Sequence, residues 1–201
     1  MTRSYHSPRR ARDAADTRRD ILRSAAELFS ADGYARVTVA EIAKRAGVAP
    51  QTVYSSAGSK SEILLEVVNE SIARTDAAAV TEAIRQTEGI SAALTVLAKG
   101  TRLGNENEQQ VIDVLFAAFP VHEDGAALWE HSTRSYRLAL REAAEHLESK
   151  ELLKVDVERA TDVLWFCFGF GAWRTLVKEC GWSWDDAEKW LAQQAITTFT
   201  H

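Results

Sequence analysis

The sequence predicts an all-α protein of nine or ten helices, in which a three-helix, helix-turn-helix domain precedes a C-terminal helical domain. Apolar residues recur at helical spacing along most of the 201 residues, and no segment shows the strict alternation of a strand. Only 3 Pro and 10 Gly are present, which is too few for an architecture built on many turns.

The first two helices are bounded by recognisable end signals. Apolar residues at helical spacing over 21–29 predict a helix that Gly33 closes, since glycine suits the left-handed position after a helix. Thr38 and Glu41 have the T-x-x-E spacing of a capping box, which predicts the start of a second, short helix. Gly47 ends this helix at a tight turn.

A third short helix and a long fourth helix follow that turn. Pro50 stands where a first helical residue is expected, a position that tolerates proline. Ser59 and Glu62 form a second capping box before the long helix. Two short helices around a glycine turn are the pattern of a helix-turn-helix, here with motif boundaries at 39–58.

The rest of the chain is expected to be helical as well. Asn105 and Glu108 have capping spacing after a break at residue 104. One helix is expected over 126–149 and another over 155–181, and the last one begins at the capping box of residues 183–186.

Charge divides the chain into a basic and an acidic part. Residues 1–60 carry 11 Lys and Arg against 6 Asp and Glu, whereas residues 61–201 carry 13 against 23. Such asymmetry suggests a basic module that faces a polyanion, although chance clustering is the alternative. We expect a basic mobile arm at 1–16, a helix-turn-helix domain at 17–75 and an acidic helical domain at 76–201.

The arm and the third helix carry the side chains suited to DNA. The N-terminal stretch of residues 1–19, which includes the arm, is rich in arginine and contains Arg18; such a stretch either follows a minor groove or the backbone or only solvates the chain. Gln51 can bond an adenine edge, and the hydroxyls of Thr52, Tyr54 and Ser55 suit phosphates. No acidic residue occurs between Arg45 and Ser61, as a phosphate-facing surface requires. The alternative is a solvated polar face.

Three runs follow one another along the first third of the chain: T-R-R-D-I-L-R-S-A-A-E-L-F-S-A-D-G-Y at 17–34, T-V-A-E-I-A-K-R-A-G-V-A-P-Q-T-V-Y at 38–54 and G-S-K-S-E-I-L-L at 58–65. In this order they resemble the TetR family of bacterial transcriptional regulators. Looser similarity to ligand domains of some members covers 155–165 and 181–191. The resemblance implies a homodimer that binds a palindromic DNA operator and responds to a small-molecule effector.

The resemblance also assigns the DNA-binding positions. They are Thr38, Arg45, Ala49, Pro50, Gln51, Thr52, Tyr54, Ser55 and Lys60. One departure stands out: the family commonly has Tyr-x-His-Phe where this chain has Tyr54-Ser55-Ser56-Ala57. The histidine contact to phosphate is therefore missing, and Ala57 buries less surface than phenylalanine would.

For the acidic domain at 76–201, the resemblance implies ligand binding and dimerisation, and the sequence offers candidate residues for both. The uncharged run 163–173 predicts a helix covered on every side, either by a second subunit or by its own core. The residues expected at the dimer face are Tyr136, Leu140, Trp165, Phe168, Ala172 and Trp173. Those expected to line an effector pocket, or else to form ordinary core, are Leu97, Ile112, Leu115, Phe116, Phe119, Trp129, Tyr136 and Trp165.

Enzymatic signatures are missing from the sequence. It has no H-E-x-x-H, no G-x-S-x-G and no phosphate-binding loop, and its five His are scattered. We therefore expect no catalysis, no metal and no cofactor. The two Cys and the lack of a membrane-length apolar stretch favour a cytoplasmic protein with no membrane partner.

The most favoured function is therefore a repressor released by its effector. Two alternatives stay open: an activator of the same fold, and a dimeric ligand-sensing module that has lost specific DNA binding.

Overall fold

The computed structural model describes residues 8–200, with side chains described from residue 12, and every regular element among them is helical. The chain divides into two compact units. Of the described residues, 8–72 and Gln110–Trp129 form the first unit, and Ala73–Gln109 and 130–200 form the second. The all-α fold class with an N-terminal helix-turn-helix is thus confirmed.

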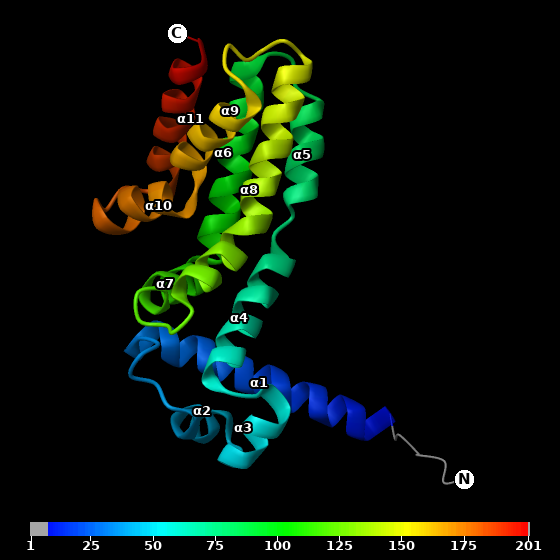
Figure 1. Ribbon diagram of the computed structural model, residues 1–201, viewed down its shortest axis with the longest axis vertical. Coiled ribbons are helices and arrows are strands. Elements are labelled where there is room, and N and C mark those ends of the chain that lie inside the picture. Colours follow the sequence, from blue (N-terminus) through cyan, green and yellow to red (C-terminus); the bar gives the residue numbers. More distant parts are fainter. Residues whose placement is uncertain (1–7, 201) are drawn as a thin grey trace. The chain divides into compact units, whose positions relative to one another are not determined.

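The first unit is built on α1 (Pro8–Asp32), against which α2 (Val39–Ala46) and α3 (Pro50–Ala57) both pack (Figure 1). All but the last two residues of α4 (Lys60–Arg74), most of α7 (Gln109–Ala118) and the segment that follows α7 up to Trp129 complete this unit. Its core contains fully buried aliphatic and aromatic side chains: Ile21, Phe29, Ile42, Val53, Ile63 and Leu64.

Helix α1 begins earlier than the sequence analysis expects. Residues 8–16, which are expected to belong to a mobile arm, form the first turns of this helix, whereas residues 1–7 lie outside the described part. Local interactions explain the extension. Thr17 Oγ1 donates to the Asp13 carbonyl at 2.8 Å, and Arg19 pairs with Asp16 one turn earlier at 2.9 Å.

The second unit centres on α6 (Ile90–Asn107), which packs against α5 (Ala77–Arg85) and α11 (Trp184–Thr200). A Cβ at Gly100 would lie 2.4 Å from Val80, so glycine allows the close approach of α5 and α6. Helices α8 (Gly125–Ser149) and α9 (Val157–Phe168) contribute to the same core, mainly through Leu140, Leu164 and Phe168.

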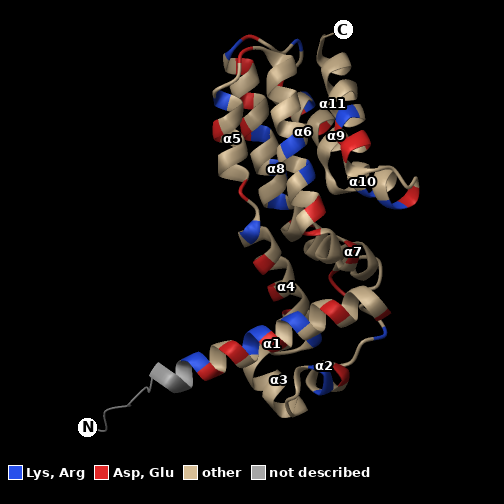
Figure 2. Cartoon of the chain, turned by 180° about the vertical axis from the view of Figure 1, so that it is seen from behind, with Lys and Arg blue, Asp and Glu red and all other residues tan. Residues whose placement is uncertain are grey.

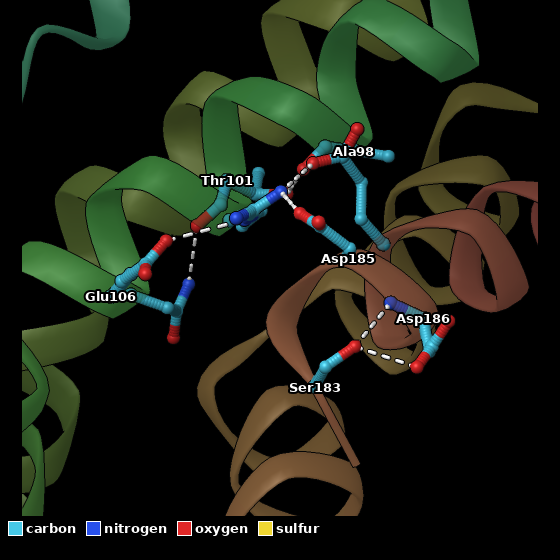
Figure 3. Close-up of polar contacts among 9 residues, drawn as sticks. Ala98, Thr101, Glu106, Ser183, Asp185 and Asp186 are labelled. Atoms are coloured by element: carbon cyan, nitrogen blue, oxygen red, sulfur yellow. Dashed lines mark hydrogen bonds and ion pairs between the residues drawn. The ribbon is translucent and has the colours of Figure 1, made fainter.

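A charged cluster fastens α6 to α11. Arg102 of α6 pairs with Glu188 of α11 at 3.0 Å and also with Asp185. It pairs with Glu106 on its own helix at 3.2 Å. Figure 3 shows Glu106 and Asp185 approaching this cluster from the two helices. Hydrogen bonds that the guanidinium donates to Glu188, Asp185 and Glu106 outweigh desolvation and raise the pKa of Arg102.

Two expected helix boundaries in this unit are wrong. The expected helix 155–181 is interrupted at Gly169, whose backbone is extended, and continues as α10 (Phe170–Trp173) and a π-helical segment, η1 (Arg174–Glu179). No break occurs at residue 104, because α6 runs on to Asn107. Asn105 is buried inside α6, and its amide bonds the side chain of Tyr136 in place of a helix terminus.

None of the helices that the structure describes has the length and hydropathy needed to cross a membrane.

Candidate nucleic-acid interface

The start of α2 is fixed by a reciprocal cap. The Glu41 backbone N–H donates to Thr38 Oγ1 at 3.3 Å, and the Thr38 N–H donates to the Glu41 carboxylate at 2.8 Å. The Thr38 hydroxyl also donates to the Glu41 carboxylate at 2.7 Å, and this bond together with the one from the Thr38 N–H lowers the pKa of Glu41. The cap confirms the predicted start of the helix-turn-helix. In the free protein both the backbone N–H and the hydroxyl of Thr38 are hydrogen-bonded to Glu41.

The turn between α2 and α3 needs a glycine. Gly47 has φ +70°, in the left-handed region, and the following Val48 N–H bonds the Ala43 carbonyl at 3.0 Å. Helix α3 then begins at Pro50, with Ala49 as its N-cap residue. The turn therefore sets the direction in which α3 leaves α2.

Helix α3 has one apolar face and one polar face. Val53 and Ala57 are buried against the unit, whereas Gln51, Ser55 and Tyr54 are exposed, with 54% of Tyr54 accessible. No charged side chain lies on α3, in contrast to α1 and α2 (Figure 2). The exposed groups are hydroxyls and an amide, which suit base edges and phosphate oxygens.

Of the remaining expected DNA-binding residues, Ala49 and Pro50 are exposed at the start of α3, and Thr52 is partly buried. The Ser55 hydroxyl donates to the Thr52 carbonyl at 3.2 Å. The structure thus brings these residues together around α3, and their roles toward DNA stay predictions.

The two predicted cations are held within the domain. Arg45 pairs with Glu27 of α1 at 2.7 Å, and both side chains are about half exposed. The Lys60 ammonium donates to the carbonyls of Tyr34 and Val37, each at 3.0 Å. Both residues are therefore engaged in intramolecular contacts in the free protein.

A residue that the sequence analysis places in the arm lies instead beside α3. The Arg18 guanidinium, on α1, donates to the carbonyl of Ser56 and pairs with Glu66 of α4 at 3.3 Å. No sequence signal identifies this contact, because the three residues are far apart along the chain and only the packing of α1 beside α3 joins them.

The predicted pocket residues are divided between the units. Ile112, Leu115, Phe116, Phe119 and Trp129 belong to the first unit, and Leu97, Tyr136 and Trp165 belong to the second. Ring contacts occur within each group: Trp129 lies 5.3 Å from Phe116 between ring centroids, and Tyr136 lies 5.6 Å from Trp165. Phe119 is 42% exposed. Whether either group lines an effector pocket stays a prediction.

A buried polar cluster joins α6, α8 and the break after α9. The Tyr136 hydroxyl accepts from the Asn105 amide at 3.2 Å and donates to the Phe168 carbonyl. Trp173 Nε1 donates to the same carbonyl at 3.0 Å. Desolvation dominates and raises the pKa of Tyr136, so this phenol keeps its proton. Tyr136 and Trp173 thus supply the hydrogen bonds of the Phe168 carbonyl at the C-terminal end of α9.

Three of the six predicted dimer residues lie in the core of the second unit. Leu140, Phe168 and Trp173 are at most 1% exposed, which is the alternative that the sequence left open for the run 163–173. Tyr136, Trp165 and Ala172 are partly buried. Phe166, which belongs to the same run, is 82% exposed. The run is therefore core on one side and surface on the other.

Comparisons with known proteins agree with this geometry. Residues 21–67 match the family model described as bacterial regulatory proteins, tetR family. A comparison with curated proteins finds no match. Among solved structures, the fatty acid degradation regulator FadR from Bacillus halodurans is 17% identical, with a TM-score of 0.73 and 96% of each chain covered.

Two further structures of the same fold contain ligands. FadR from Bacillus subtilis, in complex with stearoyl-CoA, is 17% identical with a TM-score of 0.72, covering 89% of this chain and 97% of that one. A putative transcriptional regulator from Saccharomonospora viridis, in complex with choline, is 18% identical with a TM-score of 0.69, covering 89% and 95%. At such identities the likeness shows the fold alone.

Proposed function

We propose, on the premise that residues 21–67 form a DNA-binding domain of the TetR family, that this protein is a homodimeric transcriptional repressor. It binds a palindromic operator through α3 of each subunit and leaves it when a small-molecule effector binds the second unit. This assigns the chain a regulatory role and no catalytic one.

The exposed face of α3 carries the proposal. A capped α2, a glycine turn and a proline start fix this helix, and its outward side offers an amide and hydroxyls without a single carboxylate. Gln51 is assigned to a base edge, because an amide can both donate to and accept from adenine. Tyr54 and Ser55 are assigned to the flanking phosphates and bases.

The operator requires two copies of the chain. One helix-turn-helix buries too little DNA surface for strong specificity, and dimers read half-sites about 34–36 Å apart or at multiples of that distance. The second unit offers Phe166, 82% exposed on α9, as an apolar residue for such a contact. The charged side chains of α8 are less available for contacts with a second subunit, because Arg137 pairs with Asp162 and Arg141 pairs with Glu158 within the same chain.

We assign the effector to the second unit, and the ligand-bound structures of similar fold support a small-molecule effector. Structures of this fold hold stearoyl-CoA and choline, two chemically different ligands, so the similarity supports a small molecule and not a particular class. Partly buried aromatic rings lie around Tyr136, with Phe170 at 5.2 Å and Trp165 at 5.6 Å between centroids. Such rings suit an apolar or aromatic part of a ligand.

The test is fluorescence anisotropy of the purified full chain on duplex DNA. Duplexes are first selected by the protein from a randomised library, and random-sequence duplexes of equal length are the control. Binding is measured over a range of salt concentrations, because phosphate contacts dominate nonspecific affinity. We expect tighter binding to the selected DNA by at least about 10³-fold.

The outcomes separate the competing functions. Equal binding to selected and random DNA contradicts a specific regulator and favours the sensing module without operator recognition. Specific binding together with increased expression of a reporter downstream of the selected site favours an activator. Elution of the free protein as a monomer at micromolar concentration contradicts the homodimer.

A further inference from the structure

Helix α3 is held by few apolar side chains. Of its eight residues only Val53 and Ala57 are buried, and alanine offers a single methyl group. Its N-terminal end is tied to α2 through the Gly47 turn. At its C-terminal end the Gly58 N–H bonds the carbonyls of Val53 and Tyr54, which leaves later carbonyls of the last turn to find other partners.

Arg18 supplies the partner for one of these carbonyls. Its guanidinium donates to the Ser56 carbonyl and at the same time pairs with Glu66 of α4 at 3.3 Å. A cation at the C-terminus of a helix is favoured by the helix dipole, and the guanidinium fork can hold two acceptors in a fixed geometry. One side chain of α1 thus joins the end of α3 to α4.

We propose that Arg18 is a positioning residue that fixes the orientation of α3 for DNA recognition. This inference rests on the proposed function, since it concerns how the same interface reads sequence. It differs from the role that a basic arm would give Arg18, because the guanidinium acts on the Ser56 carbonyl and the Glu66 carboxylate and not on a DNA phosphate.

The exposure of Arg18 and Glu66 indicates that their contact affects the orientation of α3 more than the stability of the first unit. The Arg18 and Glu66 side chains are 40% and 39% exposed, and ion pairs at this exposure add little to global stability. The core of the unit does not include either of them. Removal of the contact is therefore expected to leave the unit folded and to broaden the range of orientations that α3 adopts.

The variants are Arg18→Gln, Arg18→Lys and Glu66→Gln in the full chain. Arg18→Lys keeps the charge that a phosphate contact needs but loses the planar fork. Glu66→Gln leaves Arg18 in place and removes only its carboxylate partner. The matched controls are Arg23→Gln on α1, whose partner is Asp20 on the same helix, and the exposed Glu70→Gln on α4.

The first readout is anisotropy on duplexes that the wild type selects from a randomised library and on random duplexes of equal length. Arg18→Gln and Glu66→Gln are both expected to lower the ratio of selected to random affinity about tenfold, from loss of charge-assisted hydrogen bonds. Arg18→Lys is expected to lower it by a smaller factor. The salt dependence stays as in the wild type, and the controls leave the ratio unchanged.

A phosphate role gives the opposite pattern. Arg18→Gln would then lower the affinity for both duplexes by the same factor and reduce the slope of log affinity against log salt concentration by about 0.9. Arg18→Lys would bind both as the wild type does. Glu66→Gln would free the guanidinium and tighten binding. Either this pattern or unchanged ratios in both variants overturns the inference.

The second readout needs no DNA. Hydrogen exchange of the amides of 51–57 is expected to become faster in Arg18→Gln and Glu66→Gln, with unchanged exchange in the core of α1 and unchanged melting temperature. Equal exchange in wild type and variants overturns the inference. A wild type that selects no DNA sequence contradicts the proposed function, whereas the exchange experiment still decides whether Arg18 holds α3.

Discussion

The ammonium of Lys60 lies 4.4 Å from the centroid of the Tyr34 ring and donates to the carbonyl of the same residue at 3.0 Å. It also donates to the Val37 carbonyl at 3.0 Å, so the first residue of α4 ties down the loop between α1 and α2. Tyr34 is itself buried, with its ring 5.2 Å from Phe29. Lys60 therefore has a structural role in the free protein, whatever contact it makes with DNA.

Substitution of Lys60 by Met is expected to destabilise the first unit. The change keeps the length of the side chain but leaves two carbonyls without their charged donor, which costs about 1–3 kcal/mol. Urea unfolding followed by circular dichroism measures the loss, with the exposed Lys44→Met as control. Equal stability of Lys60→Met and wild type would show that the contact contributes nothing.

Substitution of Gln51 by Ala is expected to weaken operator binding without affecting the fold. Gln51 is exposed on α3, so its removal leaves the core unchanged. Loss of a bidentate base contact costs about 1–3 kcal/mol of discrimination at one base pair. Anisotropy on single-base variants of the selected duplex measures this discrimination. Uniform weakening across all variants would instead identify Gln51 as a backbone contact.

The capping carboxylates are expected to make the first unit sensitive to acid. Hydrogen bonds from Thr38 hold the pKa of Glu41 below its ordinary value of 4.5, and those from Ser59 do the same for Glu62. A folded-state pKa that is lowered adds stability above the unfolded-state value, and this stability is lost as the pH falls through the folded-state value.

The acid effect is measured by urea unfolding at pH 5.5 and pH 3.5. The double variant Glu41→Gln, Glu62→Gln is expected to lose less stability between these two pH values than the wild type does. Gln cannot be protonated in this range but still offers an acceptor to the cap. The exposed Glu70→Gln serves as control. An equal pH dependence in the double variant and the wild type would contradict the role of the caps.

Substitution of Tyr136 by Phe is expected to destabilise the second unit. The change removes one of the two donors to the Phe168 carbonyl, which keeps Trp173, and one acceptor of the Asn105 amide, which keeps the Thr101 carbonyl. Two lost hydrogen bonds at about 0.5–1.5 kcal/mol each predict a cost of about 1–3 kcal/mol. Urea unfolding measures this, with Tyr54→Phe as control, since Tyr54 is 54% exposed. A loss of unfolding free energy no larger than in the control would show that the Tyr136 hydroxyl does not stabilise the second unit.

The two cysteines are expected to differ in reactivity. Burial raises the pKa of Cys167 to about 11, whereas Cys180 is exposed after η1. Titration with an aromatic disulfide reagent at pH 8 is expected to modify one thiol quickly in the native protein and two in denaturant. Cys180→Ser should abolish the fast reaction. A fast reaction that persists in this variant would mean that Cys167 is accessible.

Local signals were enough to locate the helix-turn-helix. The caps at Thr38 and Ser59, the left-handed Gly47 and the proline start of α3 each involve residues within a few positions of one another. Their geometry depends on short-range hydrogen bonds and backbone preference, so the sequence is sufficient. The same reasoning failed at Asn105, whose capping pattern lies inside α6. There the side-chain amide donates to the Tyr136 hydroxyl on α8 and does not cap a helix.

The sequence by itself therefore determined the helical class, the caps at Thr38 and Ser59, the helix-turn-helix and the polar face of α3. Only the tertiary structure decided which side chains meet across helices. It placed Arg18 against the Ser56 carbonyl and buried Phe168 and Trp173 while leaving Phe166 exposed. The physical reason is that periodicity identifies an apolar face, whereas the partner of that face, or of a long charged side chain, depends on contacts between residues far apart in the chain.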